Sequence, residues 1–146
     1  MRQIIMSAAL IVSVAMPASA ELITVKSAKP VSETMDALEA AVGNAGATVF
    51  ARVDHQKGAA NADLQMPAAQ VLIFGNPKLG TPAMNADLRA SLYLPLKVAV
   101  HEVEGGSVLT YEDPADMFAD LDIAADAPFV KKMQGALGKL TGAAAN

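Results

Sequence analysis

The sequence predicts a single α+β domain, in which about five strands form a mixed or antiparallel sheet and helices pack mainly on one face of it. Two observations lead to this fold class. Short apolar runs rich in β-branched residues alternate with longer segments in which apolar residues recur every three or four positions. No repeat or linker divides the chain after residue 20. The expected order of elements is β-α-β-(α)-β-α-β-β-α-α.

The first strand and the first helix are predicted between residues 22 and 46. Residues 22–26 alternate with β-branched residues, which is typical of a strand. Ser32 is the expected N-cap of the helix, and Gly46 is the expected left-handed residue that ends it. One apolar stripe at helical spacing consists of Met35, Leu38, Val42 and Ala45.

Two strands are predicted in the middle of the chain. Residues 70–74 are apolar on both faces, which predicts a strand in the centre of the sheet. Residues 48–55 alternate, and the polar residues 56–67 form either a loop or a short helix. Strand geometry places on one face of the earlier strand Val49, Ala51, Val53 and His55.

Three helices are predicted in the second half of the chain. Thr81-Pro82 is a strong helix start, and this helix is expected to end before Pro95. Asp113-Pro114 predicts a short helix, residues 127–140 predict the last one, and residues 141–146 are expected to form a frayed tail. The apolar side of the first of these helices is expected to carry Met84, Leu88 and Leu92.

Strands at residues 96–104 and 107–112 flank Gly105-Gly106, which is the signal of a two-residue hairpin turn. This register places His101 opposite Thr110. It also leaves His101 on the face that meets solvent. The opposite face is expected to belong to the core and to carry Leu96, Val98, Val100, Leu109 and Tyr111.

Residues 1–20 predict a cleaved secretory signal peptide. Arg2 supplies a positive charge, residues 4–16 are almost wholly apolar, and Ala18-Ser19-Ala20 is a cleavage signal of small residues. The alternative is a retained membrane anchor, but the apolar run is shorter than the ~20 residues that a membrane-spanning helix needs. The domain itself, residues 21–140, is therefore expected in the periplasm or outside the cell, with no membrane segment after cleavage.

The composition excludes several classes of function. The chain has no cysteine, so thiol catalysis, thiolate-bound zinc and iron–sulfur clusters are excluded. Its formal net charge is −4 and it has no basic stripe, which argues against nucleic acid or anionic lipid as a partner. The sequence also contains no serine-nucleophile signature and no phosphate-binding loop.

Candidate ligand-binding residues follow the third predicted strand, because small domains often carry their sites at strand ends. Gly75 allows a ligand to approach the backbone closely, Asn76 offers a donor and an acceptor, and Pro77 fixes the turn. Tyr111, with a hydroxyl on the core face, is a further candidate. The alternative for the three turn residues is a purely structural role.

His55 is the main candidate for a metal or haem ligand or for a proton carrier, since the ordinary pKa of histidine lies near neutrality. The alternative is a histidine at the margin of the core. Met66, in the segment that follows, is a candidate soft ligand for copper. The sequence leaves the identity of any cofactor open, and His101 is expected to be an exposed neighbour of Thr110.

Four motifs in sequence order resemble the family known as domain of unknown function 302 (DUF302). They are residues 46–55, Phe74-Gly75-Asn76-Pro77 followed by Gly80-Thr81, Leu94-Pro95-Leu96-Lys97, and Tyr111-Glu112-Asp113-Pro114. The resemblance extends over about residues 24–139. It implies a compact α+β domain that is often a dimer and has no established activity or catalytic residues. One departure is Ser91-Leu92-Tyr93, where members of the family often have Ala-Leu-Asp.

These observations favour an exported, non-catalytic domain that binds a small ligand, a metal or cofactor, or a protein partner at a pocket near His55 and Asn76. One alternative is a small periplasmic enzyme, in which His55 acts as general acid or base and Asn76 orients the substrate. Another is a structural or interaction domain without a pocket. The chain is expected to form a homodimer.

Overall fold

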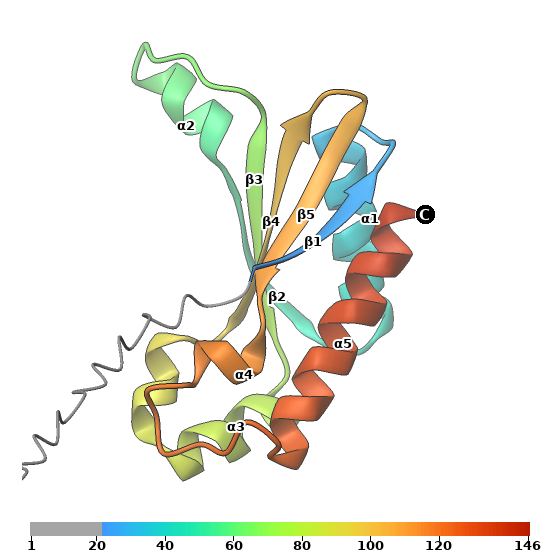
Figure 1. Cartoon of the computed structure of the whole chain (residues 1–146). Helices are drawn as coiled ribbons and strands as arrows, with labels where there is room; N and C mark the ends of the chain where they lie inside the picture. Colours follow the sequence, from blue (N-terminus) through green and yellow to red (C-terminus); the bar gives the residue numbers. More distant parts are fainter. Residues whose placement is uncertain (1–21) are drawn as a thin grey trace, which may run out of the picture.

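In the computed structural model, which describes residues 22–146, five strands form one sheet in the order β1-β5-β4-β3-β2, and every neighbouring pair is antiparallel. The long helices α1 and α5 pack against each other over one face of this sheet (Figure 1). The predicted fold class is therefore confirmed. The expected signal peptide lies outside the described residues.

The elements were mostly expected, and their bounds follow in chain order. They are β1 (Leu22–Ser27), α1 (Val31–Asn44), β2 (Thr48–Asp54), α2 (His55–Asn61), β3 (Ala69–Gly75), α3 (Pro77–Ala86), the 3-10 helix η1 (Leu88–Leu92), β4 (Leu96–Val103), β5 (Gly106–Glu112), α4 (Pro114–Met117) and α5 (Pro128–Ala145).

Helix α1 begins one residue earlier than the expected cap, because Pro30 and not Ser32 occupies the N-cap position. The Pro30 carbonyl oxygen accepts a hydrogen bond from the Thr34 amide at 3.0 Å. Gly46 follows the helix with φ +71°, which confirms its predicted left-handed role. Of the predicted stripe, Ala45 is the exposed C-cap, whereas the core contains Met35, Leu38 and Val42.

The β4–β5 hairpin turns one residue earlier than predicted, at Glu104-Gly105, and Val103 pairs with Gly106. His101 consequently lies opposite Val108 and not opposite Thr110. This error moves each residue of one strand by two positions along the other, so it leaves the faces unchanged. The predicted core face is confirmed by the burial of Leu96, Val98, Val100, Leu109 and Tyr111.

Helix α3 begins at Pro77, so Thr81-Pro82 is not its start and Pro82 lies inside it. Asn76 caps the helix by accepting a hydrogen bond from the Lys78 amide at 2.9 Å. Asn76-Pro77 and Thr81-Pro82 both have the pattern of an N-cap residue followed by proline, and the helix begins at the first of them. The helix then ends before η1, so the predicted stripe breaks: Leu88 and Leu92 are each 79% exposed.

Strand β2 contains a β-bulge between Val49 and Ala51. Val49 pairs with the buried Phe74, while Ala51 and Val53 pair with residues on the face that α1 and α5 leave uncovered. The bulge residue, Phe50, therefore breaks the alternation, and the predicted common face of Val49, Ala51 and Val53 is wrong. The strand also ends at Asp54, so that His55 begins α2.

Helix α5 continues through the expected tail, so residues 141–146 are not frayed: Thr141 and Ala144 are fully buried. Its last carbonyl groups accept hydrogen bonds from residues at the end of β1 and directly after it. The Lys29 ammonium donates to the Ala144 carbonyl oxygen at 3.1 Å, and the Ser27 hydroxyl donates to that of Ala145 at 3.3 Å. A cation at the C-terminal end of a helix is favourable because of the helix dipole.

The β4–β5 turn presses closely on β1. A Cβ atom on Gly106, whose φ is +153°, would lie 2.1 Å from the Ser27 carbonyl oxygen, whereas a Cβ on Gly105 would meet no atom within 4 Å. We predict that Gly105→Ala lowers the free energy of unfolding by about 1 kcal/mol through backbone strain alone. Gly106→Ala should lower it by about 3 kcal/mol or more, because β1 must also move.

Urea denaturation of the two variants and of Gly138→Ala measures this difference. Gly138 is exposed within α5, with open space at its Cβ position, so its replacement should raise the free energy of unfolding by about 0.5–1 kcal/mol. Equal losses for Gly105→Ala and Gly106→Ala would contradict the close approach of the turn to β1.

Candidate functional site

A cavity of about 460 Å³ lies at the end of the sheet where β3 stops, between α3, α5 and the segment that leads into β4. We call it the end pocket. Its walls come from four separate stretches of the chain, within residues 45–50, 74–84, 94–96 and 133–140. The pocket therefore exists only when the sheet and both of these helices are in place.

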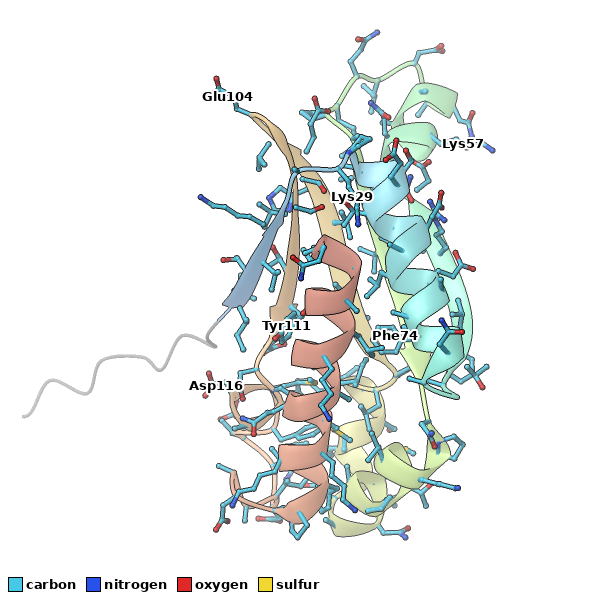
Figure 2. All side chains as sticks on the ribbon, turned by 90° about the vertical axis from the view of Figure 1, so that its right-hand side faces the viewer. Lys29, Lys57, Phe74, Glu104, Tyr111 and Asp116 are labelled. Atoms are coloured by element: carbon cyan, nitrogen blue, oxygen red, sulfur yellow. The ribbon has the colours of Figure 1, made fainter. Side chains whose placement is uncertain are left out.

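The side chains that line the end pocket are almost all apolar. Helix α5 contributes Met133, Ala136 and Leu140, of which Met133 is 1% exposed. Helix α3 contributes Leu79 and Met84, and the end of the sheet contributes the buried Phe74 and Leu96. Figure 2 shows one of these, Phe74, on the sheet beside α5. Such walls favour an apolar molecule over water.

Phe50 lies at the open side of the end pocket, since it lines the cavity and is 60% exposed. The bulge in β2 directs its ring toward the end of β3, where a Cβ on Gly75 would lie 3.4 Å from Phe50 Cε2. The same Cβ would lie 3.5 Å from Pro95. Because Gly75 has no side chain, the Phe50 ring can pack beside the backbone at this position.

Two polar side chains line the end pocket, Asn76 and Thr81. Asn76 is also the N-cap of α3, and its side-chain oxygen accepts the hydrogen bond from the Lys78 amide. None of the described residues that line the pocket is charged. A ligand there would meet an apolar wall and two neutral hydrogen-bonding groups.

The segment that brings Leu94 and Pro95 into the pocket wall is held by η1. Asp87 caps η1 by accepting from the Arg89 amide at 2.9 Å, and it also accepts from the Asp122 amide at 3.1 Å. Hydrogen bonds from the Arg89 guanidinium lower the pKa of the Asp87 carboxyl group well below its usual range. The peptide bond between Leu94 and Pro95 is cis.

His55 and Asn76 do not form a common pocket, so this prediction is wrong. Strands β2 and β3 are antiparallel: Asp54 pairs with Gln70 at one end, and Thr48 pairs with Gly75 at the other. Their lengths separate the two ends by about 20 Å. Figure 1 accordingly shows α2, which begins at His55, and α3, which follows Asn76, at opposite ends of the molecule.

This separation also contradicts an enzyme in which His55 transfers a proton while Asn76 orients the substrate. His55 is exposed at the first position of α2, and Met66 lies in the loop that returns to β3. Gln56 holds that loop by donating to the Met66 carbonyl oxygen at 3.2 Å. Within residues 22–146, no group of three or more His, Asp or Glu side chains is placed to hold a metal ion. A site formed by His55 and Met66 stays a prediction.

The other predicted site residues fall in different places. Gly75, Asn76 and Pro77 all line the end pocket. Tyr111 does not: it is 7% exposed and belongs to the hydrophobic core on the side of α5 away from Phe74 (Figure 2).

Sequence reasoning missed most of the pocket wall. Met84 was expected on the apolar side of its helix, and residues 48–55, which include Phe50, were expected to alternate regularly. Gly80, which belongs to one of the four family motifs, also lines the pocket, and a side chain at this position would be in ordinary contact with the opposite wall. A Cβ there would lie 3.6 Å from Leu94 and 3.8 Å from Met84.

Three Brucella proteins share a stretch with this chain. "Fluoride-specific ion channel FluC 1" of Brucella suis biovar 1 (strain 1330) is 41% identical over 95 residues, which cover 64% of this chain and 37% of that protein. The protein of the same name from Brucella abortus biovar 1 (strain 9-941) is also 41% identical over 95 residues, with 64% and 35% covered. The chain thus spans about a third of the length of these relatives. Within residues 22–146, no helix has the length and apolar character needed to cross a membrane.

One solved structure and one family model resemble the whole described domain. The crystal structure of the uncharacterized conserved protein DUF302 from Bacillus stearothermophilus superposes with a TM-score of 0.77 and 18% sequence identity, covering 84% of this chain and 97% of that one. At this identity the likeness shows the fold. The family model described as domain of unknown function DUF302 matches residues 23–145. The chain therefore belongs to the DUF302 family.

Proposed function

We propose that this domain binds a small, largely apolar molecule in the end pocket. The single observation that carries the proposal is a cavity of about 460 Å³ with almost wholly apolar walls. Ligand sites in proteins have volumes of roughly 300–1,000 Å³ and are mostly apolar, with a few polar groups that orient the ligand. Asn76 and Thr81 supply such groups.

Water is a poor occupant of this cavity. Its volume corresponds to ~15 water molecules, each of which needs two to four polar partners to be well held. Met133 and Leu140 are almost fully buried where they meet the cavity and offer none. An apolar ligand that displaces such weakly held water gains affinity.

We predict that N-phenyl-1-naphthylamine, an uncharged apolar fluorophore, binds with a dissociation constant on the order of 10 µM, about 0.4 kcal/mol per non-hydrogen atom. Ala136→Phe should weaken this binding about tenfold or more, because the added ring enters the cavity. Ala136 lines the end pocket from α5. Fluorescence titration measures the affinity, and circular dichroism checks that the fold is kept.

Ala143→Phe is the matched control, since Ala143 is exposed on the same helix and does not line the end pocket. It should bind the fluorophore as the unaltered protein does. Equal binding by the protein and both variants would mean that the fluorophore sits elsewhere. Absence of binding to any of them would reject the proposal.

A second candidate function is that of a partner for an ion channel. The stretch that this chain shares with the Brucella proteins occupies about a third of chains that are named fluoride-specific ion channels. Parts that occur together in one protein chain often act together. The partner proposed here is a fluoride channel.

If this second function is right, deletion of the gene for this chain should lower the concentration of sodium fluoride that stops growth. Re-expression of the chain should restore resistance, and sensitivity to sodium chloride should not change. Growth curves across a range of fluoride concentrations measure this. Unchanged fluoride resistance in the deletion strain would exclude the role.

The expected export and the expected homodimer stay proposals. Support for export is the signal-peptide pattern of residues 1–20. Support for a dimer is the sheet face opposite α1 and α5, where Val53 is 38% exposed and Val71 and Ile73 are only partly buried. Cell fractionation tests export, and sedimentation velocity tests the homodimer. A chain found in the cytoplasm would refute export. A monomer at micromolar concentration would refute the homodimer.

A further inference from the structure

We infer that the ligand of the end pocket is uncharged and carries one hydrogen-bond acceptor, such as a ketone or ester carbonyl, which the side-chain amide of Asn76 or the hydroxyl of Thr81 binds. The inference rests on the proposed function and adds the chemical class of the ligand. It depends on which donors at the pocket are already used and which are not.

The amide of Asn76 is oriented by the start of α3. Its oxygen must face the Lys78 backbone N–H, from which it accepts at 2.9 Å, because only the oxygen is an acceptor. The Nδ2 group is therefore turned away from Lys78. No described residue accepts a hydrogen bond from Nδ2, and Asn76 lines the end pocket. A donor at the pocket is left for a ligand.

Thr81 provides a second polar group from the same helix. Thr81 is exposed and lines the end pocket, and its hydroxyl makes no hydrogen bond with any described residue. In helices a threonine hydroxyl often bonds to the carbonyl group one turn earlier. The hydroxyl of Thr141 in α5 does this with the Leu137 carbonyl oxygen at 2.8 Å. The Thr81 hydroxyl differs and stays available.

The start of α3 is not an anion site, although helix starts often are. Pro77 has no N–H group, and the Lys78 amide is taken by the Asn76 side chain. The next two amides, of Leu79 and Gly80, donate to the Asn76 carbonyl oxygen at 2.9 and 3.0 Å. All the backbone donors that would hold an anion are thus occupied.

Charge argues in the same direction. No Lys, Arg, His, Asp or Glu is among the described residues that line the end pocket. A charged group inside an apolar cavity without a counter-charge is strongly unfavourable. A carboxylate would meet no cation there, and an ammonium group would meet no anion. An uncharged acceptor can use either of the two donors without this penalty.

A matched series of naphthalene compounds tests the inference by displacement of the fluorophore. Naphthalene has no polar group, 2-acetonaphthone adds a ketone, 2-naphthoate adds a carboxylate, and 2-naphthylmethylamine adds an ammonium group. The ketone should bind about fivefold more tightly than naphthalene, the factor given by one net hydrogen bond of about 1 kcal/mol. Both charged compounds should bind more weakly than naphthalene.

Asn76→Asp identifies the donor. Aspartate keeps an oxygen to cap α3 and adds a favourable negative charge at the helix start, so the fold should be at least as stable. It removes the Nδ2 donor. The fivefold preference for the ketone over naphthalene should fall to about twofold or less. Thr81→Val, which keeps the shape of the side chain, should lower the preference partly.

The outcomes separate this inference from the proposed function. If the fluorophore binds and Ala136→Phe blocks it, but the ketone has no advantage over naphthalene, the proposed function stands and this inference fails. A carboxylate or ammonium compound that binds most tightly would also overturn the inference. An unchanged ketone preference in Asn76→Asp and Thr81→Val would remove these two residues from it.

Discussion

The position of α5 is the constraint on which the rest of the structure depends. This helix is held near its C-terminal end by Lys29 and Ser27, which donate to its last carbonyl groups. Closer to its start, Gln134 donates to Asp113 at 2.8 Å, and Asp113 in turn caps α4. Between these anchors the buried side of α5 covers the sheet. Its residues around Met133 and Leu140 then form one wall of the end pocket.

The buried hydroxyl groups near the first anchor connect α5 to the sheet. The Thr34 hydroxyl lies 2.8 Å from that of Ser107 and donates to Ser27 at 3.1 Å. The three side chains come from α1, β5 and β1, and each of them is less than 8% exposed. Buried polar groups that satisfy one another in this way fix a single arrangement of the elements. A substitution that removes one of these hydroxyl groups is therefore expected to shift α5 and, through it, the wall of the end pocket.

The antiparallel order of the sheet places the two groups of candidate site residues at opposite ends of the molecule. Because β2 and β3 run in opposite directions, the segments that follow them leave from opposite ends of the sheet. One end carries α2 and the exposed His55, and the other carries α3 and the end pocket. Among residues 22–146, those at the second end form the almost wholly apolar walls of the end pocket, which is why the proposed ligand site lies there.

The sequence was sufficient for the features that depend on local pattern. Alternation in the β4–β5 hairpin identified the core face correctly, since the error of two positions in the register preserved it. It was insufficient where two local signals competed, as at Asn76-Pro77 and Thr81-Pro82, and where no signal exists, as at the bulge of Phe50. It also could not place His55 relative to Asn76, because that depends on which strands pair. Pairing is decided by packing across the whole sheet and not by residues near each strand end.

The central claim is that the end pocket is the ligand site, and the methionines offer the most direct measurement of it. Residues 22–146 contain five, of which Met84 and Met133 line the pocket, while Met35 and Met117 lie in the core and Met66 lies near α2. Methyl-labelled protein titrated with 2-acetonaphthone should show shifted resonances, and contacts to the ligand, for Met84 and Met133 alone. A shift confined to Met66, or none at either pocket methionine at saturation, would contradict the account.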